Sequence, residues 1–96
     1  MALYQYAQFP DGLRILHTNI VGDIAGEWKL YVHFEQFNDD GLKDARIELP
    51  TYTWEYNYGF SDEEIQRFEK IAHDASTFFF EYAQCGGIEQ CLSSTV

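Results

Sequence analysis

Apolar and polar residues alternate most regularly between positions 28 and 49, and this pattern predicts the best-defined hairpin of a β-sheet. The apolar set on its two strands is Trp28, Leu30, Val32 and Phe34, followed by Ala45, Ile47 and Leu49. An Asn-Asp-Asp-Gly turn that pairs Phe37 with Leu42 sets three apolar pairs on one face, so turn and pattern give the same register. The pairs are Phe34 with Ala45, Val32 with Ile47, and Leu30 with Leu49. The other face, where His33 lies opposite Arg46, is expected to be solvated or to form a binding surface.

A first hairpin is expected before it, over positions 3–20. Its strands, 3–9 and 13–20, are joined by Pro10-Asp11-Gly12, in which proline presets φ and glycine supplies a positive φ. Both alternate sets of this hairpin contain apolar residues, so the alternation does not decide which of its faces is buried. One set is Leu3, Ala7, Phe9, Leu13 and Ile15, and the other is Tyr4, Tyr6, Leu16 and Ile20; we favour the first. Positions 21–26 contain two glycines and an aspartate and are typical of a loop.

After Pro50, large aromatic side chains recur at every second position. They are Tyr52, Trp54, Tyr56 and Tyr58. The alternation predicts a possible fifth strand with all four aromatic rings on one side. Two interpretations stay open: the rings pack in the core beneath a helix, or they form a partly exposed face for a partner, since Tyr and Trp often anchor interfaces.

One long amphipathic helix is predicted from about Asp62 to Ala83. Ser61 is a suitable N-cap, and Glu64 completes a capping box with it. The apolar stripe at helical spacing is Ile65, Phe68, Ile71, Ala72, Ala75, Phe79 and Tyr82. Phe80 falls outside this stripe, so we expect it to contact the C-terminal tail, a second copy of the chain or another partner.

Together these elements predict an α+β fold. We expect an antiparallel sheet of four to five strands, made of two hairpins plus a possible fifth strand, with one long C-terminal helix packed on one face. The 96 residues are near the commonest size for one domain. A single domain is therefore predicted over 1–92, with a mobile tail over 93–96.

Composition suggests the compartment. The chain lacks a basic segment followed by an apolar run, and its apolar stretches are far shorter than the roughly 20 residues that span a bilayer. We therefore expect no signal peptide, no membrane association and a cytoplasmic location. Cys85 and Cys91 could form a bridge, but a reducing compartment favours free thiols. Two cysteines also give too few ligands for structural zinc, and no metal is expected.

Charge changes the picture most. Sixteen Asp and Glu against six Lys and Arg give a formal net charge of −10. Such a chain is repelled by nucleic acid and by anionic membranes, and it attracts a basic protein. The charge could also serve only to keep the domain soluble. The candidate protein-binding residues are Asp39, Asp40, Asp44, Glu48, Tyr52, Trp54, Tyr56, Tyr58, Glu63 and Phe80.

Signatures of catalysis are missing from the sequence. It contains no GxSxG, P-loop, GxGxxG or HExxH motif, and His17, His33 and His73 stand in no metal or nucleophile spacing. We therefore expect no catalytic residue and no cofactor. The leading hypothesis is a non-enzymatic inhibitor that captures a basic, nucleic-acid-handling protein by electrostatic attraction or by imitating nucleic acid, with carboxylates in place of phosphates. The alternative is a structural module that forms a homodimer through its aromatic strand and helix, and a small enzyme without a recognisable motif comes third.

In size, acidity and α+β makeup the chain is similar to phage-encoded inhibitors of bacterial defence, such as anti-CRISPR proteins. It is similar in the same respects to small immunity proteins that neutralise basic nuclease toxins. The resemblance covers overall character and transfers no residue roles. It implies an inhibitor that acts on a basic partner.

Overall fold

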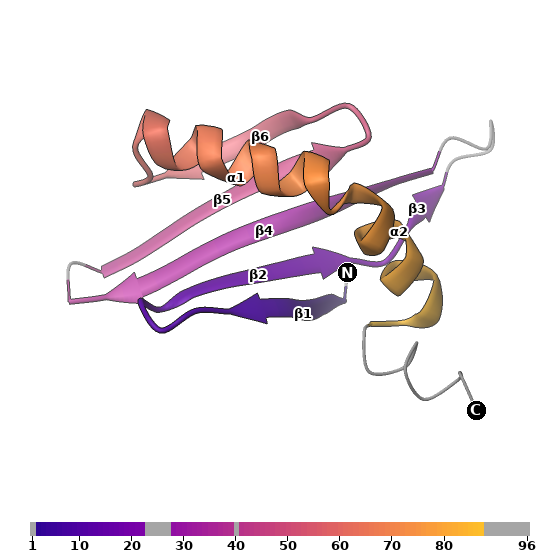
Figure 1. Cartoon of the computed structure of the whole chain (residues 1–96), viewed down its shortest axis with the longest axis horizontal. Coiled ribbons are helices and arrows are strands. Elements are labelled where there is room, and N and C mark those ends of the chain that lie inside the picture. Colours follow the sequence, from indigo (N-terminus) through magenta and orange to yellow (C-terminus); the bar gives the residue numbers. More distant parts are fainter. Residues whose placement is uncertain (1, 23–27, 40, 88–96) are drawn as a thin grey trace.

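The computed structural model describes residues 2–22, 28–39 and 41–87. Within them the elements are β1 (Leu3–Gln8), β2 (Leu13–Thr18), β3 (Val21–Gly22), β4 (Trp28–Asn38), β5 (Gly41–Leu49), β6 (Thr53–Tyr58), α1 (Asp62–Asp74) and α2 (Ser76–Cys85). The strands form one antiparallel sheet in the order β1-β2-β4-β5-β6, and the short β3 pairs with β4 (Figure 1). The α+β class is confirmed. The sheet has six strands among the described residues, because part of the predicted loop pairs as β3.

The register of the second hairpin is the predicted one. Phe37 lies opposite Leu42, Phe34 opposite Ala45, and the apolar pairs continue to the far end of the strands. The capping box is also present: the Ser61 side chain accepts from the Glu64 backbone N–H at 3.2 Å, and the Glu64 carboxylate accepts from the Ser61 backbone N–H at 3.0 Å. That backbone hydrogen bond lowers the pKa of Glu64.

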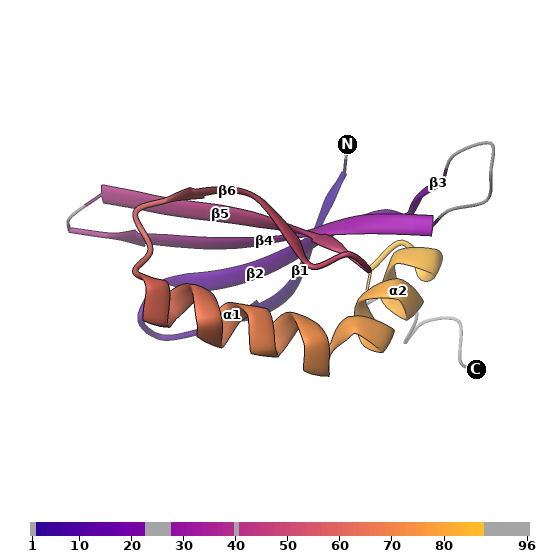
Figure 2. The same cartoon turned by 90° about the horizontal axis from the view of Figure 1, so that it is seen from above.

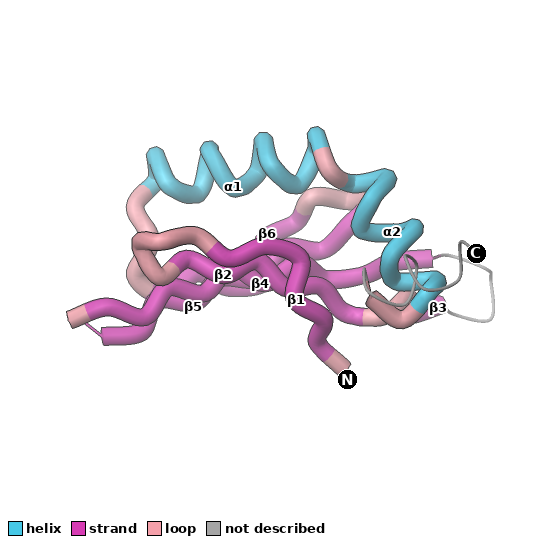
Figure 3. The backbone as a smooth tube through the Cα atoms, turned by 60° about the horizontal axis from the view of Figure 1, so that its bottom comes forward, coloured by secondary structure: helices cyan, strands magenta, loops and turns pink. Residues whose placement is uncertain are grey.

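The prediction of one long helix is wrong, because the chain breaks at Ala75. Its backbone has φ −106° and ψ 7°, outside the helical region, and α2 leaves the axis of α1 there (Figures 1 and 3). The break preserves hydrogen bonding, since the Ala75 N–H donates to Ile71 O and its carbonyl accepts from the Phe79 N–H, both at 3.0 Å. Helical positions extrapolated past Ala75 therefore no longer apply.

Phe80 shows the consequence of this break. The sequence placed its ring on the outward side, but Phe80 is half-buried and packs against the core. Phe78 is exposed instead, with 49% of its surface accessible. The outward placement of Phe80 is therefore wrong, for the physical reason that α2 is turned relative to α1, while its contact with a partner stays a prediction.

Both helices lie on the same face of the sheet (Figure 2). The core between the layers is made of Leu13, Ile15, Leu30, Val32, Phe34, Ala45, Ile47, Leu49, Phe60, Phe68, Ala72, Ala75, Phe79 and Ala83. At its centre the fully buried ring of Phe68 stacks on Phe34 of β4, with centroids 4.5 Å apart and planes 6° from parallel. Phe60 meets Phe68 edge-on at 4.9 Å. Three aromatic rings thus join α1 to the middle of the sheet.

The first hairpin follows neither alternate set completely. Its register shifts between Gln5 and Ala7, so Tyr6 and Ala7 both pack against the core while Leu3 stays exposed. Phe9 is exposed as well. On β2 the favoured residues Leu13 and Ile15 are buried, but so is Leu16 from the other set. A β-bulge changes which face each residue takes, and a two-residue alternation does not reveal it.

Cys85 departs from the expectation of free thiols, since it is disulfide-bonded. After α2 the chain turns sharply, because Gly86 and Gly87 both adopt left-handed conformations, with φ 88° and 114°. Cys91 and the predicted tail, 93–96, lie outside the described residues. Disulfides persist in oxidising compartments, so the bond at Cys85 gives no support to the cytoplasmic location predicted from the sequence.

A histidine is buried in this core. His17 lies between the rings of Tyr4 and Phe79, with centroids 5.5 and 5.9 Å away. Its Nδ1 is 2.9 Å from the carbonyl of Thr18, which can only accept, so Nδ1 carries the proton. The buried Nε2 has no hydrogen-bond partner. Burial lowers the pKa of His17, because a proton added at Nε2 would be cut off from water.

The Phe68 stack and the helix cap give the first testable prediction. Phe68→Ala should cost roughly 3–5 kcal/mol of unfolding free energy, since the ring is fully buried. Ser61→Ala should cost about 1 kcal/mol through the lost cap. Urea denaturation measures both changes. A larger loss for Ser61→Ala than for Phe68→Ala would contradict this description of the core.

His17 gives a prediction about pH. Its folded-state pKa lies below the unfolded value of about 6.5, so the unfolded chain binds the proton first as pH falls. Its contribution to stability is therefore complete above that value and decreases below it. His17→Phe keeps an aromatic ring and removes the titration, so its unfolding free energy should change less between about pH 7 and 5 than that of the wild type. Urea midpoints with equal pH slopes would rule out the buried neutral His17.

Candidate protein-binding surface

Among the described residues, no helix lies on the sheet face opposite α1 and α2 (Figure 2). We call it the open face. The strand registers place on it Leu3, Gln5, Arg14, Leu16, Thr18, Lys29, Tyr31, His33, Glu35, Phe37, Leu42, Asp44, Arg46, Glu48, Tyr56 and Tyr58. It is therefore aromatic and charged, whereas the hydrophobic core lies on the other face, beneath the helices.

Arg46 lies at the centre of the open face and is held on three sides. Its guanidinium carbon is 4.7 Å from the ring centroid of Tyr31 and 5.5 Å from that of Tyr56. The same guanidinium forms an ion pair with Glu55. Cation–π contact and ion pairing both restrict the long side chain, so Arg46 stands in a defined conformation between two rings.

Tyr56 extends this cluster through hydrogen bonds. Its hydroxyl donates to the Asp44 carboxylate at 3.1 Å. Nδ1 of His33 lies 3.5 Å from the Tyr56 hydroxyl oxygen. Burial, followed by the charge and the hydrogen bond of Asp44, raises the pKa of Tyr56 to about 12. Burial, followed by the charge of Arg46, lowers the pKa of His33. At neutral pH the network therefore contains a neutral phenol and a neutral imidazole.

Large apolar side chains are exposed where the open face meets the β4–β5 turn. Phe37, Leu42 and Tyr58 have 75%, 61% and 66% of their surfaces accessible, and we call these three residues the apolar tip. Phe37 pairs with Leu42, while Tyr58 lies opposite Asp44, the next residue of β5 on this face. The Tyr58 ring is 5.1 Å from that of Tyr56. The apolar tip is thus continuous with the group of residues around Arg46. We call that group the Arg46 cluster; it consists of Tyr31, His33, Asp44, Arg46, Glu55 and Tyr56.

The structure brings together on the open face four of the residues predicted from sequence. They are Asp44, Glu48, Tyr56 and Tyr58. Exposed Asp39 lies in the turn beside the apolar tip, and Asp40 is outside the described residues. Glu63 lies on α1, in the layer that covers the other face.

The expectation that four aromatic rings share one side of β6 is wrong. Trp54 faces the core, 5.9 Å from Phe34, while Tyr56 faces away from it. Tyr52 precedes the strand with φ 57° and stacks on His73 of α1, 3.5 Å between centroids. The cause is a register shift in the β5–β6 pairing, which adds a residue at Glu55.

Sequence reasoning missed the Arg46 cluster. The predicted register already placed His33 opposite Arg46, which was the available signal. The position of Tyr56 depends on the bulge, so its contacts with Arg46 and Asp44 had no signal in the alternation.

The helices carry more net negative charge than the open face, although most of the carboxylates lie elsewhere in the chain. Described residues of α1 and α2 include six carboxylates and two basic side chains. The open face, with Glu55 at its border, carries three basic and four acidic side chains, and Arg14 pairs with Glu35 at 4.0 Å. Within the described ranges no helix is long and apolar enough to cross a membrane, and no group of three or more His, Cys, Asp or Glu is placed to hold a metal ion.

The network gives a prediction for Tyr56. Its phenol should remain protonated to about pH 11, which the ¹³C resonance of the oxygen-bearing ring carbon reports. Asp44→Asn removes the negative charge that opposes ionisation and should lower the pKa of Tyr56. Glu48→Gln, on the same strand, is the matched control and should leave the titration unchanged. If Asp44→Asn titrated like the wild type, the described contact between Tyr56 and Asp44 would be incorrect.

Comparison with known proteins returns no relative: no family model, no curated protein and no solved structure matches the chain. The similarity to phage inhibitors and immunity proteins therefore consists of overall character, and no match in sequence or fold accompanies it. Function has to be inferred from the surfaces of the chain itself.

Proposed function

We propose that the protein is a non-enzymatic binding module that captures a basic protein partner on the open face of its sheet. The observation that carries this proposal is the apolar tip, which is uncovered and continuous with the Arg46 cluster. Contiguous exposed apolar groups with a polar surround are typical of interaction sites. Tyrosine and arginine, the residues beside the tip, are those that most often dominate binding energy at interfaces.

The conformation of the Arg46 cluster supports this proposal. Arg46 is held by two rings and a carboxylate, and Tyr56 by Asp44. Ordering long side chains on association costs about 0.5–1.5 kcal/mol each. Side chains already held in place avoid much of that cost.

The distribution of charge supports a basic partner. The net charge of −10 raises the encounter rate with a positively charged protein over a Debye length of about 8 Å at physiological salt. The nearly balanced open face can then form the short-range contacts. A partner that handles nucleic acid has a basic surface, and blocking that surface would make this protein an inhibitor.

The pKa of Tyr56 favours binding over acid–base catalysis at its hydroxyl. A general acid or base works best with a pKa near the operating pH. The pKa of Tyr56 is raised to about 12, away from neutrality. Its hydrogen bond to Asp44 therefore suits a structural role on a binding surface.

Site-specific photo-cross-linking tests the proposed surface. A benzophenone amino acid replaces exposed Phe37 in one variant and, as the matched control, exposed Gln66 on the outer side of α1 in another. We expect the Phe37 variant to capture a protein partner in cells of the native host and the Gln66 variant to capture none. Cross-links from Gln66 alone would contradict the proposal. Cross-links between two copies from position 37 would favour the homodimer instead.

Association kinetics with the captured partner test the role of charge. Two double variants remove the same net charge from different sides of the molecule. The first, Asp39→Asn with Glu48→Gln, acts on the open-face side. The second, Glu69→Gln with Asp74→Asn, acts on the helix layer. Both pairs should slow association, and the first should slow it more, with little change in dissociation. Wild-type binding should weaken toward about 0.5 M salt, where the screening length is about 4 Å. Equal effects of the two pairs would argue against the open face, and flat salt dependence would argue against electrostatic capture.

A further inference from the structure

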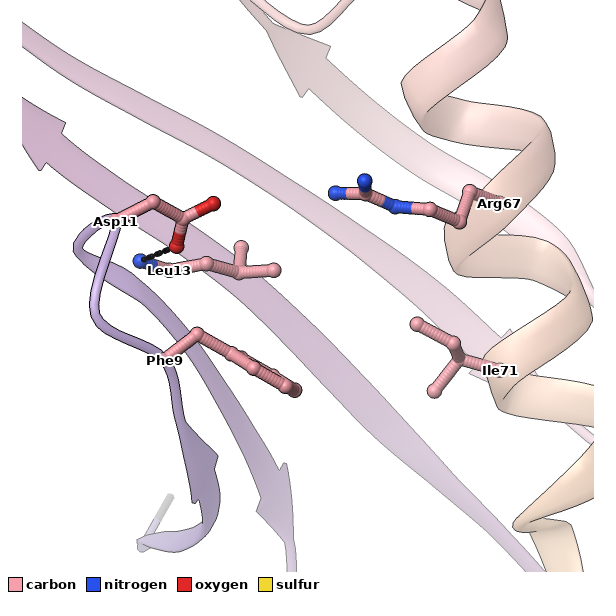
Figure 4. A pocket seen from close by; sticks show the side chains of 5 residues that line it. All are labelled: Phe9, Asp11, Leu13, Arg67 and Ile71. Atoms are coloured by element: carbon pink, nitrogen blue, oxygen red, sulfur yellow. Dashed lines mark hydrogen bonds between the residues drawn. The ribbon is translucent and has the colours of Figure 1, made fainter.

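A small cleft lies on the helix side of the molecule, between the β1–β2 turn and α1. Its volume is about 270 Å³, and it is lined by Phe9, Asp11, Leu13, Arg67 and Ile71 (Figure 4). Ligand pockets commonly measure roughly 300–1,000 Å³, so this cleft is suited to a ligand at the small end of the range. It lies on the opposite side of the sheet from the open face.

The turn that forms one wall is held rigidly. The Phe9 N–H donates to Leu13 O at 2.8 Å, and one Asp11 carboxylate oxygen accepts from the Leu13 N–H at 3.0 Å. Gly12, with φ 90°, approaches β4 so closely that an added Cβ would lie 2.7 Å from Phe37 O. The wall is therefore formed before any ligand arrives, which lowers the entropic cost of binding.

The lining divides into an apolar part and a charged rim. Phe9 and Leu13 on one side and Ile71 on the other supply the apolar walls. At the rim, the Arg67 guanidinium and the second carboxylate oxygen of Asp11 point toward each other across the opening (Figure 4). Among the described ion pairs none joins Arg67 to Asp11. A positive and a negative group thus face the same space.

We propose that this cleft binds a free α-amino acid with an apolar side chain. The ligand carboxylate pairs with the fork-shaped Arg67 guanidinium, the ammonium group pairs with Asp11, and the side chain packs between Phe9, Leu13 and Ile71. A purely anionic ligand would be repelled by Asp11, and a purely cationic one by Arg67. A zwitterion satisfies both charges.

Titration with two amino acids tests the site. ¹⁵N-labelled full-length protein is titrated with L-leucine and with L-phenylalanine to about 10 mM, a range that detects millimolar affinity. We expect saturable shifts of the backbone amides of Leu13, Arg67 and Ile71. N-acetyl-L-phenylalaninamide has the same ring without either charge and should bind at least about tenfold more weakly. No saturable shift with either amino acid, or equal binding of the blocked compound, would overturn the proposal.

Variants test the two charged residues separately. Arg67→Gln and Asp11→Asn should each weaken amino-acid binding by about tenfold or more, since each removes one charge-assisted contact. Asn can accept the Leu13 N–H as Asp does, so Asp11→Asn keeps the turn. Exposed Lys70, one turn along α1, provides the control Lys70→Gln, which should bind as the wild type does. Undiminished binding by Arg67→Gln or Asp11→Asn would overturn the assignment, and neither result bears on the open face.

Discussion

The stack of Phe68 on Phe34 is the contact on which the rest of the molecule depends. It joins α1 to the central strand β4 through two fully buried rings, at the centre of the sheet face that the helices cover. The chain has one helix layer among its described residues, so covering one face leaves the other to satisfy its own polar groups. The Arg46 cluster does so by cation–π, ionic and hydrogen-bond contacts, but the apolar tip remains exposed.

Sequence reasoning succeeded where a periodic pattern and a local signal agreed. The β4–β5 register followed from alternation together with its turn, and the start of α1 followed from Ser61 and Glu64. It failed where one residue changes the phase. The shifts after Gln5 and after Arg46 each insert a residue into a strand, and the chain bends at Ala75 although alanine is the best helix former. Tertiary packing sets these features, and local propensity carries no trace of them.

The same limits apply to the candidate surface. Register was enough to place Asp44 and Glu48 on the face away from the helices. The contacts around Arg46 could not be predicted from the sequence, because they require Tyr56 to lie on the open face while Trp54 points into the core. Composition gave the total charge of −10, but its division between the helix layer and the open face emerged only once the layers were known. Carboxylates therefore lie on both sides of the molecule: six are on α1 and α2, and Glu35, Asp44 and Glu48 lie among the aromatic rings of the open face.

The central claim is that the open face is where a partner binds, and hydroxyl-radical footprinting of the captured complex tests it most directly. Radicals modify exposed aromatic and aliphatic side chains, so free protein should be labelled at Phe37, Leu42, Tyr58 and Phe78, all of which are exposed. In the complex, we expect protection of Phe37, Leu42 and Tyr58, while Phe78 on the helix side stays labelled. The opposite result, in which Phe78 is protected while Phe37, Leu42 and Tyr58 are labelled as in the free protein, would contradict the proposed binding surface.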